Sequence, residues 1–241
     1  MIWIFNEIFY RPILNALILI YERIAFHDFG IALILLTILI RLLLAPFFHR
    51  GARDQAIINV LAPKIKEIQK THKDNREHQA KALMNLYREH RVNPFSGFLL
   101  LLIQLPVLIA LYHVVWNGFS EVLVPMLYSF TPNPGTINYL FLNIVDLQGK
   151  NMALVILAAA ASYFQMKIAM PKTPAPSLGE PQAPMALAMK QMVFIAPAIT
   201  AVFLVVLPSA ISLYLLTSFA FSAIQQLIIN KQVAGYGTVK K

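Results

Sequence analysis

The sequence contains no cysteine, few charged residues, and no aspartate or glutamate in the long apolar runs that follow residue 28. The absence of cysteine excludes disulfides, thiolate catalysis and cysteine-based metal sites. Charged residues make up 13% of the chain, whereas hydrophobic residues make up 58%. A soluble domain of this length needs more polar side chains to cover its surface. Several runs approach the roughly 20 apolar residues that a membrane-spanning helix needs, so the sequence predicts a polytopic membrane protein.

Signatures of common enzymes are also missing. The sequence has no His-Glu-x-x-His pair, no glycine-rich phosphate-binding loop and no paired aspartates in an apolar run. We therefore expect a protein that is not an enzyme and that uses no cofactor and no metal.

The order of apolar and polar segments predicts an all-α membrane protein with five transmembrane helices. An N-terminal interfacial amphipathic helix and a cytoplasmic helical hairpin complete the predicted fold. The predicted segments are an extracytoplasmic interfacial helix at 1–27, transmembrane helix 1 at 28–48, the hairpin at 49–93, transmembrane helix 2 at 94–117, an extracytoplasmic loop at 118–150, transmembrane helix 3 at 151–170, a cytoplasmic Pro-rich loop at 171–190, transmembrane helices 4 and 5 at 191–230, and a cytoplasmic tail at 231–241.

The first twenty residues permit two interpretations. They are apolar enough to span the membrane, but Glu7, Arg11 and Pro12 interrupt the run. These interruptions favour a helix that lies along the membrane surface, with a spanning helix as the alternative.

The polar segment 49–93 predicts two short amphipathic helices. Apolar residues recur at three- and four-residue spacing in each half, and 73–75 between them has the composition of a turn. The apolar positions are Ile57, Leu61, Ile65 and Ile68 in the first half, and Ala80, Leu83, Met84 and Tyr87 in the second. The two helices are expected to pack against each other as an antiparallel hairpin.

The distribution of positive charge predicts the orientation of the chain. Ten of the 20 lysines and arginines lie in 49–93, and six more lie beside the Pro-rich loop and in the tail. Only Arg11, Arg23 and Lys150 fall on the opposite side. Because cytoplasmic loops carry the excess of basic residues, the hairpin and the C-terminus are placed in the cytoplasm and the N-terminus outside. The net charge of +9 thus reflects membrane topology and not a nucleic-acid partner.

Arg41 is the one charged residue well inside an apolar run. A charge near the middle of a span costs about 2.5–3.5 kcal/mol on insertion scales, so it normally faces protein or a wet cavity. The alternative is that Arg41 snorkels to the cytoplasmic interface. Because no acidic residue lies in the spans, a buried Arg41 needs water or a partner from outside.

Polar side chains occur in other predicted spans as well. Thr37 lies one turn before Arg41 on the same helix face, and Gln104 and Gln165 lie in the second and third spans. Hydroxyls and amides often only join helices to one another. Together with Arg41, however, they suggest a polar groove that receives hydrophilic segments of another chain.

Several ordered motifs resemble a known family. They are Thr37-Ile38-Leu39-Ile40-Arg41 followed by Pro46, Pro63-Lys64-Ile65, Leu86-Tyr87, the run from Val92-Asn93-Pro94-Phe95 through Gln104-Leu105-Pro106 to Ala110-Leu111-Tyr112, Leu207-Pro208-Ser209, Leu213-Tyr214, and Ile224-Gln225-Gln226. In this order and at this spacing, over about residues 28–232, they resemble the YidC/Oxa/Alb membrane protein insertases, in the short bacterial YidC form.

The resemblance implies a five-helix core in the bacterial inner membrane, with a hydrophilic groove open to the cytoplasm and to lipid. Arg41 is expected to attract acidic residues of the translocated tail, with Thr37, Gln104, Gln165 and Tyr214 lining the groove. The implied partners are nascent membrane proteins, the ribosome, the Sec translocon and the lipid bilayer, with no nucleic acid bound directly. A monomer is the expected form.

The chain departs from the family pattern at three points. Leu215 stands where many relatives carry an aromatic residue, the large extracytoplasmic domain of many members is missing, and the C-terminal tail is brief. Two other functions remain open: a Sec-associated chaperone or assembly factor with the same groove, and a small secondary transporter. The transporter predicts inverted repeats or an ion site at mid-membrane, and the sequence shows neither.

Overall fold

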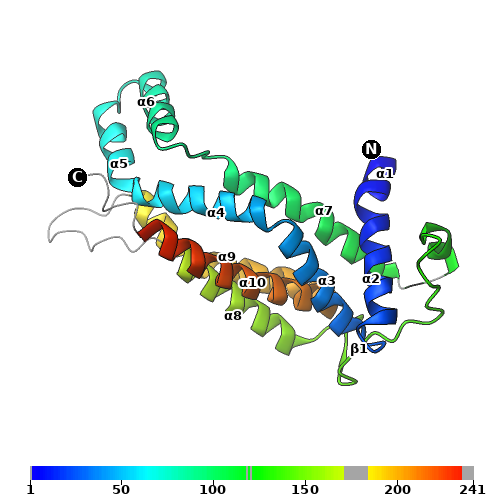
Figure 1. Ribbon diagram of the computed structural model, residues 1–241. Coiled ribbons are helices and arrows are strands. Elements are labelled where there is room, and N and C mark those ends of the chain that lie inside the picture. The colour runs from blue at the N-terminus through cyan, green and yellow to red at the C-terminus, as the bar shows by residue number, and fades with distance from the viewer. Residues whose placement is uncertain (1, 118, 120, 171–183, 235–241) are drawn as a thin grey trace.

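The computed structural model describes residues 2–117, 119, 121–170 and 184–234, and it is mostly helical (Figure 1). The predicted Pro-rich loop lies for the most part outside the described residues. In chain order the elements are α1 (Ile2–Phe5), the π-helix η1 (Asn6–Tyr10), α2 (Arg11–Arg23), α3 (Phe29–Leu43), α4 (Ala45–Val60), α5 (Ala62–Thr71), α6 (Arg76–Glu89), α7 (Ser96–Asn117), the 3₁₀ helix η2 (Glu121–Met126), β1 (Leu140–Phe141), β2 (Val145–Asp146), α8 (Met152–Ala169), α9 (Pro184–Val206) and α10 (Ser209–Ala234).

Among the described residues, two helices are long and apolar enough to cross a membrane. They are α8 and α10, and the bent pair α3–α4 makes a third if it counts as one span. In α7 and α9 the apolar stretches of the described part, Gln104–Trp116 and Gln191–Val206, are shorter. A helical membrane protein is therefore confirmed, while the number of five spans stays a prediction.

The outer faces of the long helices are apolar. On α8 and α9 many large apolar side chains are more than half exposed, as Phe164, Phe194, Ile199 and Val202 illustrate. Water would leave this surface poorly solvated, whereas lipid tails solvate it well.

The predicted first span is bent. Helix α3 ends at Leu43 and α4 begins at Ala45, with an angle of 66° between them. Pro46 causes a break here, because proline has no N–H to donate and its ring clashes with the carbonyl four residues earlier. The chain restarts as α4 with Pro46 in the first turn, where an N–H has no helical acceptor. The bend turns α4 across the bundle.

Side-chain caps fix three helix starts. The carboxylate of Asp28 accepts a hydrogen bond from the Ile31 N–H at 2.9 Å. Asn75 and Asn151 cap α6 and α8 in the same way. Each cap satisfies one of the free N–H groups at a helix N-terminus and costs about 1 kcal/mol when it is removed.

The N-terminal helices α1, η1 and α2 cross the direction of α7, α8 and α10 at a steep angle (Figure 1). Buried Asn15 ties α2 to the loop after η2: its amide donates to the Met126 carbonyl at 3.0 Å and accepts from the Tyr128 N–H at 2.7 Å. A helix that lies across the spans agrees with a position along the membrane surface, which stays a prediction.

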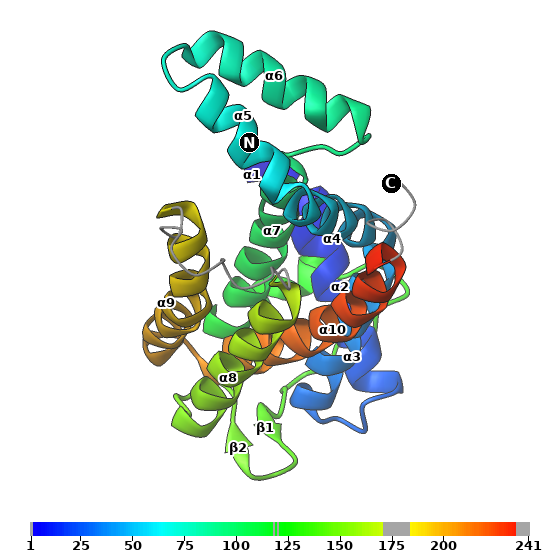
Figure 2. The ribbon, with the colours of Figure 1, turned by 90° about the vertical axis from the view of Figure 1, so that its left-hand side faces the viewer.

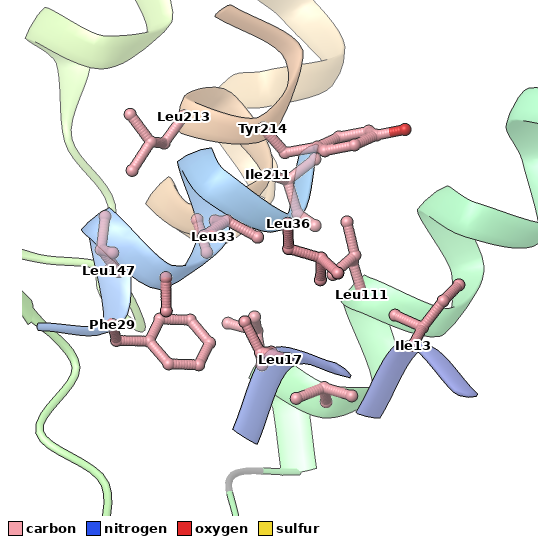
Figure 3. Packing of buried hydrophobic residues seen from close by; sticks show 14 of the residues in the cluster. Ile13, Leu17, Phe29, Leu33, Leu36, Leu111, Leu147, Ile211, Leu213 and Tyr214 are labelled. Carbon is pink, nitrogen blue, oxygen red and sulfur yellow. The ribbon is translucent and has the colours of Figure 1, made fainter. Parts of the chain in front are cut away.

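The main apolar cluster joins α2, α3, α7 and α10 (Figure 3). Leu17 of α2, Leu33 of α3, Leu111 of α7 and Ile211 of α10 are almost fully buried in it. Each fully buried large side chain stabilises the fold by about 1.5–3 kcal/mol. Leu147 of the loop before α8 is also buried here, so the loop is fixed to the bundle.

A second apolar cluster lies at the other end of the molecule, where α5 and α6 project from the bundle (Figure 2). Ile57 of α4, Ile65 of α5 and Leu86 of α6 pack there against Ile229 and Val233 of α10. The two helices α5 and α6 contact each other, and the Gln79 amide donates to the Gln69 carbonyl at 3.2 Å. The second cluster thus connects the last turns of α10 with α4, and α5 and α6 continue it beyond the bundle; the side of the membrane on which they lie stays a prediction.

The close contact between α3 and β1 gives a test of this fold. A Cβ atom added to Gly30 would lie 2.2 Å from Cδ2 of Phe141. We expect Gly30→Ala to destabilise the purified protein by about 1–3 kcal/mol, as overpacking does in a filled interior. Thermal unfolding in detergent measures this loss. The matched control is the same substitution in a Phe141→Ala background, where the clash is relieved; an equal loss in both backgrounds contradicts the packing described here.

Candidate functional site

A polar cavity of about 240 Å³ lies between the two apolar clusters. Along α10, Tyr214 belongs to the main cluster, Ser222 lines the cavity, and Ile229 belongs to the second cluster. The same order holds along α3 and α4: Leu36 belongs to the main cluster, Arg41 lines the cavity, and Ile57 belongs to the second cluster. The cavity is therefore a polar zone held between two packed zones.

Arg41 is 8% exposed and forms part of the cavity wall. Its Nη1 donates a hydrogen bond to Oγ of Ser222 at 3.1 Å, and its guanidinium lies 4.6 Å from the centre of the Phe48 ring. The ring face is electron-rich, so it attracts the cation. Among the described residues Arg41 has no carboxylate within 4.0 Å. Its charge is therefore solvated by a hydroxyl and a ring without being neutralised.

The structure brings three more of the sequence-predicted residues to this place. Gln104 of α7 and Gln165 of α8 line the cavity with Arg41. The Gln104 amide donates to the hydroxyl of Tyr214, whose phenol points toward α7 (Figure 3). Tyr214 itself is 2% exposed and is not among the residues that line the cavity. Its hydroxyl holds the Gln104 amide in place through this hydrogen bond. The side chains come from three different helices.

Thr37 occupies a different position. It is buried on the same helix as Arg41, but its hydroxyl donates to the Leu33 carbonyl of its own helix at 2.6 Å. It is not among the residues that line the cavity. Such a bond to the preceding turn is common for threonine in apolar helices.

Sequence reasoning missed part of the lining. Phe48 and Ala52 come from α4, which the bend at Leu44 turns over the cavity, and Phe219 comes from α10. Leu215, which departs from the family pattern, lies in the same wall. Ser222, Gln225 and Gln226 lie three and four residues apart on α10, so helical periodicity is the signal that could have grouped them on one face.

The cavity offers hydrogen-bond donors and one positive charge. Arginine is a pure donor, amides donate and accept, and no carboxylate is among the residues that line it. Within the described part of the chain, no group of three histidine, cysteine, aspartate or glutamate side chains could hold a metal ion. The arrangement suits carboxylates or backbone carbonyls of a polar segment, and it offers no nucleophile paired with a base.

Comparison with known proteins shows which family the chain resembles. The model of the family "60Kd inner membrane protein" matches residues 20–235. A protein of Geobacter metallireducens named "Membrane protein insertase YidC" is 28% identical over 226 residues, which cover 93% of this chain and 37% of that protein. Proteins of the same name from Francisella philomiragia and Francisella tularensis subsp. novicida are each 31% identical over 204 residues, 85% of this chain and 33% of theirs. The chain thus spans about a third of the length of these curated relatives, and the resemblance seen in the motifs is confirmed.

The polarity of the cavity gives a testable prediction. Because the chain has no cysteine, a single introduced thiol reports without background. We expect Gln165→Cys in the cavity to react with a water-soluble maleimide in proteoliposomes, since the reactive thiolate forms only in contact with water. Ile199→Cys on the exposed apolar face of α9 is the matched control and should stay unreactive until detergent is added.

Equal protection of both positions, with full labelling of both after denaturation, would show that the cavity is dry. Rates at Gln165→Cys at least about tenfold above those at Ile199→Cys support a wet cavity, because a thiol in apolar surroundings keeps its proton.

Proposed function

Since this chain belongs to the 60Kd inner membrane protein family, we propose that it is a membrane protein insertase. It receives newly made membrane proteins at the cavity around Arg41 and passes their hydrophobic segments into the lipid. The name of its relatives supports the activity, and the fold of apolar helices supports its place in a membrane.

The observation that carries the proposal is the environment of Arg41. A positive charge is held in an apolar bundle with no carboxylate of the described residues beside it, and amides from α7 and α8 point at the same cavity. Maintaining an unneutralised charge at this depth is costly, so such residues are usually functional. An acidic residue in the outgoing tail of a client is the partner that this charge lacks.

The apolar surface supplies the second half of the proposed mechanism. The cavity is bordered by helices whose outer faces are apolar and exposed, as Leu105 on α7 and Leu227 on α10 illustrate. A client's polar tail would gain hydrogen bonds in the cavity while its hydrophobic segment lies along these faces. No covalent step and no nucleotide are needed, because transfer of the apolar segment into lipid is itself favourable.

We also propose the orientation and partners expected from the sequence. The hairpin helices α5 and α6 carry six of the 20 lysines and arginines and lie at the end of the bundle beyond the cavity (Figure 1). That position suits a cytoplasmic platform that receives clients from the ribosome, alone or together with the Sec translocon, with the N-terminus on the outer side.

A Sec-associated chaperone that only folds clients in the membrane is the competing function. It would use the same cavity but would not need to attract an acidic tail across the bilayer. The two functions therefore differ in how they depend on the charge of Arg41.

The test is insertion of a single-span client with an acidic N-terminal tail into liposomes that contain only this purified chain. Protection of the tail from external protease measures translocation. We expect Arg41→Ala to reduce protection about tenfold, since hydrogen bonds to charged groups contribute about 1.5–3 kcal/mol. Arg41→Lys keeps the charge and is expected to retain part of the activity, although it loses the two-pronged geometry of the guanidinium.

The matched control is a client whose acidic tail residues are replaced by their amides, which should respond little to Arg41→Ala. If both clients lose protection equally, Arg41 serves only to hold the structure. If the wild-type chain protects neither client while a known insertase does, the insertase proposal is wrong and the chaperone function is favoured.

A further inference from the structure

A second cavity, of about 570 Å³, lies between the first turns of α4 and the second half of α10, which run side by side in Figures 1 and 2. Its walls are largely apolar. The lining residues are Ala45, Pro46, His49, Arg50, Phe221, Ile224, Gln225 and Ile228. The insertase mechanism makes no use of this cavity.

The two cavities share one lining residue, Gln225. The amide of Gln225, which borders both cavities, donates to the carbonyl of Ala45 at 3.3 Å. This contact joins α10 to the start of α4. Apart from Gln225, the two cavities are lined by different residues.

Two basic side chains stand at one edge of the apolar cavity. Arg50 is exposed, and within the described residues its guanidinium has no hydrogen bond and no ion pair. Asp54, one turn further along α4, is already occupied: it accepts from Ser96 Oγ at 2.7 Å and from the Asn93 N–H at 3.2 Å. Asp54, the acidic residue nearest to Arg50 in the helix, therefore does not neutralise the charge of Arg50.

The remaining wall opens toward the apolar surface. Ile224 is 62% exposed and Ile228 is 51% exposed, so the cavity continues into the face that lipid tails cover. Arg50 and His49 follow directly after Phe48, the last residue of the predicted first span. The cavity therefore combines an apolar interior with a basic edge at the level where lipid headgroups are expected.

We propose that this cavity binds one anionic phospholipid, with an acyl chain between α4 and α10 and the phosphate at Arg50 and His49. An arginine at the membrane surface attracts acidic lipids by about 1 kcal/mol, which is the contribution expected of Arg50, while His49 offers a hydrogen bond to the phosphate. A client helix is about 10 Å wide with its side chains, whereas an extended acyl chain is much narrower and enters a cavity of about 570 Å³ more readily.

The chain's own tail is a poorer occupant. Residues 235–241 follow α10 directly and end in two lysines, whose charge would repel Arg50. The phospholipid site does not depend on insertase activity, so the two proposals can fail separately.

The test measures lipid binding to the purified full chain in detergent, by native mass spectrometry, with phosphatidylglycerol and phosphatidylcholine that carry identical acyl chains. Phosphatidylglycerol should bind more tightly, and Arg50→Gln should weaken its binding about fivefold. Arg88→Gln on α6, an exposed arginine away from the cavity, removes the same charge and should leave binding unchanged. Equal binding of the two lipids by the wild-type chain, or equal effects of the two variants, would overturn the proposal.

A second measurement identifies the occupant directly. A photo-reactive side chain at position 228, on the apolar wall, should form an adduct with phospholipid in native membranes. An adduct with the apolar segment of a client protein would overturn the lipid site in favour of a client path. Displacement of the lipid by glycerol phosphate alone would also overturn it, because the proposal assigns most of the affinity to the buried acyl chain.

Discussion

The structure depends on the solvation of one positive charge inside an apolar bundle. Arg41 is held by a hydroxyl and an aromatic ring, neither of which cancels its charge. Neutralising it with a buried carboxylate would have removed the field that an incoming acidic group can feel. Leaving it in contact with lipid would have cost several kcal/mol more. In the proposed mechanism, a cavity lined by amides keeps the charge both stable and available to an acidic group of a client.

That cavity exists because the first long apolar segment is bent. A straight helix through Leu44 would carry Phe48 and Ala52 away from α10. The 66° bend at Pro46 instead turns α4 toward α7 and α10, so that Phe48 covers Arg41. Asp54 fixes the turned helix by bonding to Asn93 and Ser96 at the start of α7. The bend thus places the aromatic partner of Arg41, and α4 supplies part of the wall of both cavities.

The sequence predicted where the helices lie along the chain better than it predicted how the helices are rotated against one another. The span at 151–170 agrees with α8 within a residue at each end, because an Asn cap and an apolar run mark its limits. Arg41, Gln104 and Gln165 line one cavity, and their role as a client-binding groove stays a prediction. Thr37 bonds instead to its own helix. The contact of Arg41 with Ser222 depends on how α10 is rotated against α3, which helical periodicity alone does not give. Pro46 marks a break in the apolar run, but the direction in which α4 turns depends on its packing against α7 and α10, which the sequence alone does not give.

The placement of the polar zone between two packed clusters has a mechanical consequence. Tyr214 is fixed in the main cluster and Ile229 in the second, so α10 is held at both ends while the residues between them face a cavity. The lining groups therefore sit on a supported helix, and a polar segment that enters meets donors already in position. Preorganisation of this kind reduces the ordering that binding requires. The stretch of α10 between the clusters can tolerate many amides and hydroxyls because the apolar packing that holds this helix lies before and after that stretch, at Tyr214 and Ile229.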